Sequence, residues 1–173
     1  VALNSAGIAE VSLPLLAAQY SDNCGVASAS VLPNMFDCSQ TGEQVVTVTV
    51  TDLSGLTTVA VTTVTVIDNT APVVDCPDNI TRCADENPVE YAAPVAADNC
   101  LTGGTWNLES GLESGSEFPA GTTTQWYTYT DASGNKGSCS FDVVIAEPAV
   151  IGNVSVMHDV NGQGVGAIGI SVT

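Results

Sequence analysis

Basic residues are almost absent from this chain. Its 173 residues include two Lys or Arg and one His, against 19 Asp or Glu, which gives a formal net charge of −17. A surface with this balance repels nucleic-acid phosphates and anionic lipid headgroups, and it therefore argues against nucleic acid as a partner. The ligands that a surface of this sign attracts are cations.

Long apolar runs are also missing. Thr interrupts the Val-rich segments every residue or two, whereas a membrane-spanning helix needs roughly 20 consecutive apolar residues. No membrane insertion is therefore expected. Because 45% of the residues are nevertheless hydrophobic, the chain can bury a core and should fold. It has no initiator Met and no signal peptide, and it stops in a strand-like pattern, which indicates a mature product or a segment of a longer chain.

Motifs typical of catalysis are missing too. The only His, His158, lies just before an Asn-Gly turn, and the chain has neither a Gly-x-Ser-x-Gly nor a His-Glu-x-x-His sequence. Glu109, Glu113 and Glu117 fall in a loop rich in Ser and Gly, where solvated charge is a simpler interpretation than a catalytic carboxylate pair. We therefore expect a protein that is not an enzyme.

What the chain has in abundance is the two-residue alternation of β-strands. Residues 44–55 and 57–68 alternate Val with Thr, and Asp52-Leu-Ser-Gly55 supplies a tight turn between them. Residues 124–145 repeat this arrangement, with Asp131-Ala-Ser-Gly-Asn135 at the turn. The predicted fold class is all-β.

An internal repeat organises the chain. The sequence Asp-Asn-Cys occurs at residues 22–24 and 98–100, 76 positions apart, and the turn residues Asp52 and Asp131 are 79 positions apart. Two landmarks at nearly one period indicate two copies of one module. We expect the first copy at residues 1–69 and the second copy at residues 70–147. Residues 148–173 match neither copy and are predicted to be either the start of a further module or a strand donated to a neighbour.

Six cysteines in an acidic, strand-rich chain without a Cys-x-x-Cys sequence indicate disulfides rather than a zinc site. Disulfides in turn predict an oxidising compartment outside the cell. If each copy closes on itself, Cys24 pairs with Cys38 in the first copy. In the second copy, Cys76 and Cys139 clip the ends of the module, which leaves Cys83 with Cys100.

Acidic and amide side chains recur at the predicted loops and at the joint between the copies. Oxygen ligands that arrive from several loops at one end of a β-sandwich are the ligands that calcium prefers. We expect a calcium ion at the module junction, with Asp22, Asp52 and Asp68 as its direct ligands. The alternative is that these side chains cap their own backbones in turns, and the sequence leaves both open. The full candidate set is Asp22, Asp52, Asp68, Asn69, Asp98 and Asp131.

Trp106 is the candidate for a glycan contact, because an exposed indole ring stacks on sugars. A buried position in the core of an immunoglobulin-like sandwich is the favoured alternative for this residue.

The second copy resembles a hyalin repeat (HYR) module through "DNTAPVVDCPDNIT", "YAAPVAADNC" and "SGSEFPAGTTTQWYTYTDASGNKGSCSFDVVI", between Asp68 and Ile145. The first copy, through "DNCGVASASVLPNMFDCSQTGEQVVTVTVTDLSG", is similar to related modules in long surface proteins of gliding, Bacteroidota-type bacteria. It departs from the pattern where Thr58-Val-Ala60 replaces the expected Ser-x-Cys. Residues 148–173 resemble, more weakly, the opening strands of a repeat in gliding adhesins.

The resemblance implies tandem immunoglobulin-like β-sandwich modules that act as a structural and adhesive segment of an extracellular cell-surface protein. We expect this segment to be held by disulfides and stiffened by calcium. The expected partners are neighbouring repeats or identical subunits, with surface glycans or host ligands as further candidates. One alternative is a filament subunit that polymerises by donating a strand from residues 148–173. A second is an accessory module of a secreted hydrolase.

Overall fold

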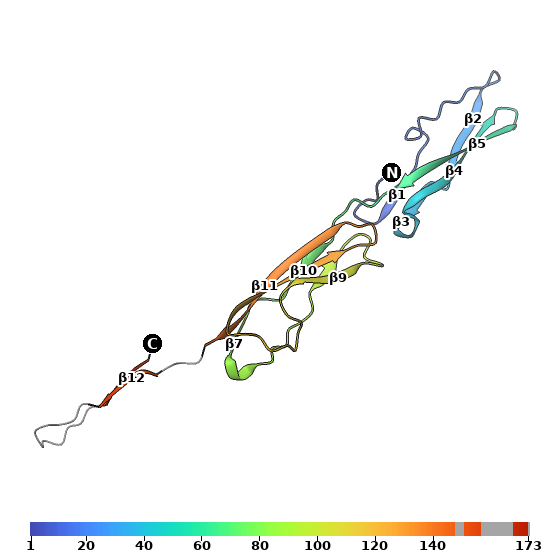
Figure 1. Cartoon of the computed structure of the whole chain (residues 1–173). Helices are drawn as coiled ribbons and strands as arrows, with labels where there is room; N and C mark the ends of the chain where they lie inside the picture. The colour runs from blue at the N-terminus through green and yellow to red at the C-terminus, as the bar shows by residue number, and fades with distance from the viewer. Residues whose placement is uncertain (148–150, 157–167, 173) are drawn as a thin grey trace, which may run out of the picture. The chain divides into compact units, whose positions relative to one another are not determined.

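The structure is a computed structural model that describes residues 1–147, 151–156 and 168–172 (Figure 1). The described residues form strands joined by turns, with short 3-10 helices at Cys38–Gln40 and Ala84–Glu86, so the all-β prediction is confirmed. None of their helices has the length and apolar character needed to cross a membrane. The strands are β1 (Ile8–Glu10), β2 (Val26–Leu32), β3 (Met35–Asp37), β4 (Gly42–Asp52), β5 (Thr57–Val66), β6 (Val73–Asp75), β7 (Ile80–Cys83), β8 (Val95–Ala97), β9 (Thr105–Ser110), β10 (Gly121–Thr130), β11 (Lys136–Ala146), β12 (Ile151–Val156) and β13 (Ile168–Val172).

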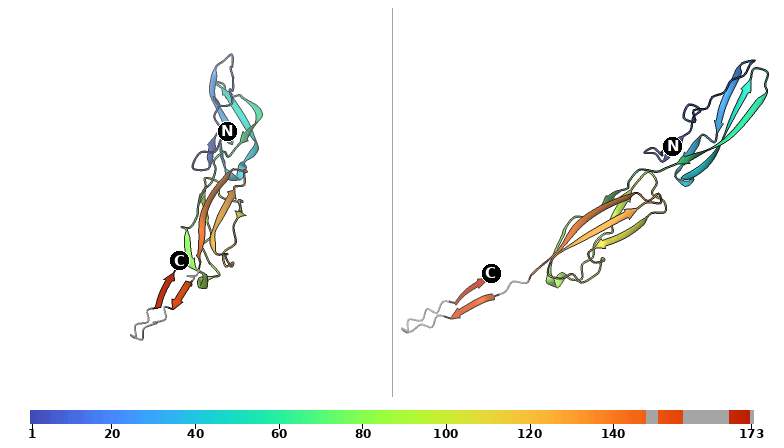
Figure 2. Two further views of the ribbon diagram at one scale, coloured as in Figure 1. Left: turned by 60° about the vertical axis from the view of Figure 1, so that its left-hand side comes forward. Right: turned by 45° about the horizontal axis from the view of Figure 1, so that its top comes forward.

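The strands pair in several small sheets, which the two views of Figure 2 show from different sides. In the first copy, β2, β4 and β5 form one sheet in the order β2-β4-β5, and β1 pairs with β3. In the second copy, the order is β7-β11-β10-β9, and β6 pairs with β8. Strands β12 and β13 pair with each other in antiparallel orientation. The predicted donated strand falls in this segment, of which residues 148–150, 157–167 and 173 lie outside the described part.

The hairpin of β4 and β5 shows why the Val and Thr alternation forms a sheet here. Its register is unbroken from Gly42 opposite Val66 to Thr51 opposite Thr57. Because side chains alternate between the two faces of a strand, one face of β4 carries Val46, which is fully buried. Val59 lies on the other face of the hairpin and is 57% exposed. The sheet therefore has one inner face, directed at the core, and one outer face.

The chain forms two compact units, each assembled from separate stretches of sequence. The first unit comprises Val1–Cys76, Pro94–Glu109 and Trp126–Ser140, and the second comprises Pro77–Ala93, Ser110–Gln125 and Phe141–Thr173. These bounds differ from the expected copies at residues 1–69 and 70–147, because β10 and β11 each contribute residues to both units. The first unit therefore contains residues of both copies, and a functional site within it can draw side chains from both.

A hydrophobic core holds the first unit together. Fully burying a Val, Leu or Phe side chain contributes about 1.5–3 kcal/mol, so a cluster of this size stabilises the unit strongly. Cys100 of the second copy packs in this core beside residues of the first copy. The members of the core are Leu3, Ala9, Val11, Val31, Phe36, Val46, Val66 and Cys100.

The second unit has its own buried residues, gathered around aromatic rings. Tyr91 makes edge-on contacts with Phe118 and Phe141, at centroid distances of 6.5 and 5.1 Å. The side chain of Asn87 donates to the Phe118 carbonyl at 2.8 Å and accepts from the Phe118 amide at 3.0 Å, which fixes the backbone of that segment. Val143 and Ile145 of β11 complete the apolar interior.

The structure contains two disulfides. Cys76 is bonded to Cys139, the pair expected from the copy arrangement, and Cys38 is bonded to Cys100. The expected pairs Cys24–Cys38 and Cys83–Cys100 do not form, and Cys24 and Cys83 are free, exposed thiols.

Strand length explains why the expected bridge from Cys24 to Cys38 is wrong. Cys24 precedes β2 at the end of the sheet where Val26 pairs with Asp52, whereas Cys38 lies shortly before Gly42, at the opposite end of β4. Eleven residues of β4 separate these ends, or roughly 30 Å at about 3.3 Å per residue. A disulfide requires Cα atoms no more than about 7 Å apart. The other expected bridge, Cys83–Cys100, is wrong because Cys100 is bonded to Cys38 instead.

Candidate metal centre

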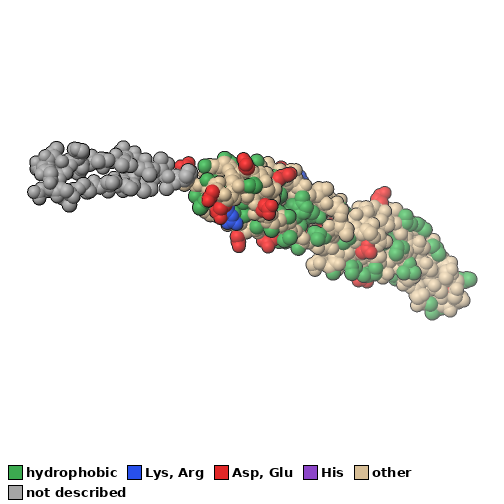
Figure 3. All heavy atoms as spheres, turned by 90° about the horizontal axis from the view of Figure 1, so that it is seen from below, with side chains coloured by type: hydrophobic (Ala, Val, Ile, Leu, Met, Phe, Trp, Pro, Cys, Tyr) green, Lys and Arg blue, Asp and Glu red, His purple; other side chains and the backbone are tan. Residues whose placement is uncertain are grey.

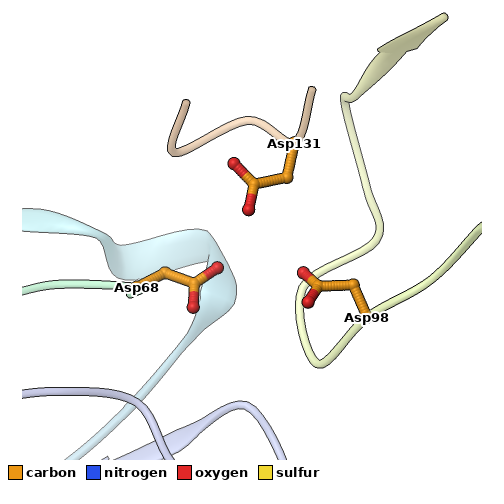
Figure 4. A group of neighbouring side chains, drawn as sticks. All are labelled: Asp68, Asp98 and Asp131. Carbon is orange, nitrogen blue, oxygen red and sulfur yellow. The ribbon is translucent and has the colours of Figure 1, made fainter. Parts of the chain in front are cut away.

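Three carboxylates meet in the first unit. Asp68 follows β5, Asp98 follows β8, and Asp131 lies in the turn between β10 and β11; one oxygen of each lies within 4.8 Å of the others. Figure 4 shows the three side chains directed toward one another from separate segments of the chain. We call Asp68, Asp98 and Asp131 the carboxylate trio.

Asp131 is held in place by the turn that it caps. Its Oδ1 accepts hydrogen bonds from the backbone amides of Ser133 and Asn135, both at 2.8 Å, and its Oδ2 accepts one from the Asn135 side chain at 2.8 Å. Gly134 takes the positive φ of 92° that the turn requires. The same side-chain amide of Asn135 also donates to the Asp68 carbonyl at 3.1 Å, so the turn is tied to the joint between the copies.

Asp98 and Asp68 are oriented in a similar way, but each keeps an oxygen free. Asp98 Oδ2 accepts from the Cys100 amide at 3.1 Å, and Asp68 Oδ1 accepts from the Thr70 amide at 3.1 Å and from the Asn99 side chain at 3.3 Å. The other oxygens, Asp68 Oδ2 and Asp98 Oδ1, are buried without a hydrogen-bond partner, as is Asn99 Oδ1. Backbone capping therefore accounts for one oxygen of each of these two carboxylates and leaves the other oxygen unexplained.

Burial makes the unpaired oxygens energetically costly. Asp68 is 6% exposed and Asp131 is 5% exposed. The buried oxygens of Asp68 and Asp98 that have no hydrogen-bond partner lose their hydration, and three carboxylates within a few ångströms repel one another. A divalent cation among them removes both costs, since it pairs with the free oxygens and neutralises the charge. Calcium is a divalent cation that binds through carboxylate and carbonyl oxygens.

The carboxylate trio differs from the expected set of direct calcium ligands, which grouped Asp22 and Asp52 with Asp68. Asp52 and Asp68 lie at opposite ends of β5, so they cannot bind one ion. Asn69 is exposed. Asp22 and Asp52 instead line a separate hollow at the far end of the hairpin. The signal in the sequence was the repeat, because Asp98 and Asp131 are the two repeat landmarks of the second copy and Asp68 lies at the joint that precedes this copy.

The remaining acidic side chains are dispersed. Figure 3 shows them scattered over the face in view, among hydrophobic and uncharged side chains. Where a pKa shift is resolved, its cause is local: the Ser39 hydroxyl and then the Ser39 amide lower the pKa of Asp37. Hydrogen bonds from Asn107 and then Thr128 lower the pKa of Glu109.

Trp106 is exposed, so the expected core position is wrong for this residue. Its side chain is 41% exposed and lies against Tyr127 and Tyr129, at centroid distances of 6.4 and 5.0 Å. The three rings form a small aromatic cluster on β9 and β10, in which Tyr129 is buried. A glycan contact at Trp106 stays a prediction. His158 lies outside the described residues.

Comparison with known proteins gives a family match over the second copy. Residues 67–145, which include the whole carboxylate trio, match the family model described as "HYR domain". Hyalin of Lytechinus variegatus is 35% identical over 138 residues, covering 73% of this chain and 25% of hyalin. The rat "Sushi, von Willebrand factor type A, EGF and pentraxin domain-containing protein 1" (Rattus norvegicus) is 36% identical over 107 residues, covering 60% of this chain and 3% of that protein.

The chain thus spans a quarter or less of the length of these curated relatives. The relatives come from animals, so the bacterial origin suggested by the first copy and by residues 148–173 finds no support. Among solved structures, cadherin domains 1–4 of protocadherin gamma B7 cover 86% of this chain and 50% of that chain, with 12% identity and a TM-score of 0.41. A likeness at this level supports no argument about function.

Proposed function

We propose, from the HYR domain at residues 67–145, that the chain is a non-enzymatic structural and adhesive segment of an extracellular surface protein, stiffened at its module joint by calcium. The observation that carries the proposal is the pair of buried, unpaired oxygens on Asp68 and Asp98 inside the carboxylate trio. Its partners would be neighbouring repeats or identical subunits, with surface glycans as a further candidate.

The disulfides support the extracellular and structural parts of this proposal. Disulfides persist in oxidising compartments and are rare in the cytosol. One of them, Cys38–Cys100, joins a residue of the first copy to a residue of the second. The other, Cys76–Cys139, ties the residue after β6 to β11 within the second copy. Both bonds restrain the region around the joint, as a segment that transmits force requires.

A cation at the trio would act on the same region. Asp68 lies just after β5, the strand that leaves the first copy, while Asp98 and Asp131 belong to two separate loops of the second copy. An ion bound by all three would replace the repulsion among them by attraction, and the joint would lose freedom of movement. Asn99 brings one more unpaired oxygen next to Asp98, and water would complete the six to eight ligands that calcium takes.

The melting temperature of the full chain is expected to be higher in calcium than in a chelator. A ligand that binds only the folded state stabilises it by about 2.7 kcal/mol at 100 times its Kd. The measurement is differential scanning calorimetry in calcium, in magnesium and in chelator. Magnesium should give the smaller shift, because it demands a tight octahedral shell and dehydrates reluctantly. Equal melting temperatures in calcium and in chelator would contradict the calcium site.

A further inference from the structure

The loop that brings Asp98 to the carboxylate trio is covalently attached to the first copy. Asp98, Asn99 and Cys100 are consecutive residues after β8, and Cys100 is bonded to Cys38 of the first copy. The backbone amide of Cys100 also donates to Asp98 Oδ2 at 3.1 Å. Because Cys100 is 7% exposed and belongs to the core of the first unit, the disulfide fixes the backbone two residues away from a carboxylate of the trio.

Asn99 lies between the disulfide and the trio and contacts both. Its carbonyl oxygen is 3.3 Å from Cys38 Sγ. Its side-chain amide donates to Asp68 Oδ1 at 3.3 Å and to the carbonyl oxygen of Asn4 at 3.1 Å. Its own Oδ1 is buried without a hydrogen-bond partner. A displacement of the disulfide would therefore displace a residue that is hydrogen-bonded to Asp68.

Gly7 of the first copy packs directly on this arrangement. A Cβ atom on Gly7 would lie 2.8 Å from the carbonyl oxygen of Asn99 and 2.8 Å from Cys38 Sγ, so its backbone is in close contact with both. The φ of 71° at Gly7 is the left-handed conformation that favours glycine. The loop after β8 thus rests against the first copy at the disulfide itself, and the position of Asp98 depends on that contact.

The disulfide acts against the repulsion within the trio. Three carboxylates whose oxygens lie within 4.8 Å of one another repel when no cation is bound. Asp131 is held by its own turn, whereas Asp98 is held by a loop that the Cys38–Cys100 bond attaches to the first copy. Without this bond the loop moves away and relieves the repulsion. Calcium must then bring it back, and the apparent affinity falls with the fraction of molecules in which the trio is assembled.

We propose that the Cys38–Cys100 disulfide sets the calcium affinity of the carboxylate trio. The inference rests on the proposed calcium site and adds its regulation. A dithiol reductant gives two electrons and two protons to the bond, which yields the two thiols and leaves the reductant as a disulfide, and the calcium site is weakened. Coupling between two equilibria is reciprocal, so calcium protects this bond from reduction by the same factor.

The second disulfide is the natural control. Cys76 follows β6 and Cys139 lies within β11, so neither residue belongs to the loop that carries Asp98 or to the turn that carries Asp131. Loss of this bond removes a crosslink of nearly the same length, because the sequence separations of the two disulfides are 63 and 62 residues. An effect specific to Cys38–Cys100 is therefore separable from the general effect of losing a disulfide.

Calcium titration calorimetry of the chelator-treated full chain tests the first half of the coupling. Every protein carries Ala in place of the two exposed thiols, so that these cannot exchange with the disulfides. We expect Cys38→Ala with Cys100→Ala to weaken calcium binding about tenfold, as when about one molecule in ten has the trio assembled. Cys76→Ala with Cys139→Ala should leave the Kd within about twofold. Circular dichroism confirms that both proteins are folded.

Equilibrium reduction tests the second half and requires no change at either disulfide. The protein is equilibrated with mixtures of a reduced and an oxidised dithiol, in calcium or in chelator, and each bond is quantified by alkylation and mass spectrometry. In saturating calcium Cys38–Cys100 should be about tenfold harder to reduce, which is a potential about 30 mV more negative for two electrons. Cys76–Cys139 should be reduced equally in both buffers.

The outcomes separate this inference from the calcium site on which it rests. If the protein without Cys38–Cys100 binds calcium as tightly as the protein with both bonds, the coupling is overturned and the calcium site stands. An equal shift of both bonds in calcium also overturns the coupling, because calcium then acts through the overall stability of the fold. Absence of calcium binding to the protein with both bonds overturns the calcium site and the coupling together.

Discussion

Replacing both Cys38 and Cys100 by Ala is expected to lower the free energy of unfolding by roughly 4 kcal/mol, because the bond closes a loop with a sequence separation of 62 residues. The bond limits the conformations of the unfolded chain, and its loss restores them. Cys100 is 7% exposed, so Ala, which carries no polar group into the core, is the suitable replacement. Urea unfolding of the two proteins gives the difference.

The matched control is the double replacement of the exposed thiols, Cys24→Ala with Cys83→Ala. Because these residues are unpaired in the structure, this protein should unfold within about 0.5 kcal/mol of the wild type. The pairing predicted from copy arrangement requires the opposite, since it bonds Cys24 to Cys38 and Cys83 to Cys100. A control protein as unstable as the Cys38/Cys100 variant would therefore show that the observed pairing is wrong. Peptide mapping without reductant gives an independent answer.

The strands were predictable because their information is local. Val and Thr alternate through β4 and β5, and a two-residue period leaves few other conformations for such a sequence. The turns were predictable for the same reason. Asp52 and Asp131 each accept hydrogen bonds from amides two and four residues further on, so their role as turn residues follows from nearby sequence alone.

The disulfides and the metal ligands were predictable only in part, because they depend on contacts between the copies. Copy arrangement alone assumes that each module completes itself. The structure instead combines Cys38 of the first copy with Cys100 of the second, and Asp68 of the joint with Asp98 and Asp131. The repeat spacing shows which positions of the two copies are equivalent. It does not show which residues of one copy contact residues of the other. That choice is made by distances in the folded chain.

The position of Trp106 illustrates another limit. The alternation of β10 places Tyr127 and Tyr129 on one face, and both lie against Trp106. Whether such an aromatic group is covered depends on tertiary packing, which the local pattern does not encode. Here Trp106 stays 41% exposed, while Tyr129 beside it is 5% exposed.

Asp68→Asn is expected to change stability in opposite directions with and without calcium. In chelator the variant should be more stable than the wild type, since it removes one negative charge from three carboxylates whose oxygens lie within 4.8 Å of one another. Two unit charges at that separation repel by on the order of 3 kcal/mol at an effective dielectric constant near 20. The side-chain oxygen of Asn still accepts the bonds from Thr70 and Asn99.

In calcium the order should reverse, because the variant loses a charged ligand and with it the stabilisation of about 2.7 kcal/mol expected at 100 times Kd. Asp78→Asn is the control, since it removes the same charge from an exposed position outside the trio and should shift neither curve. Thermal unfolding of the three proteins in both buffers measures the crossing. A variant less stable than the wild type by the same amount in both buffers would mean that Asp68 only caps its turn. A crossing would mean that the repulsion within the trio is balanced by a bound cation, which makes the stiffness of the joint depend on calcium outside the cell.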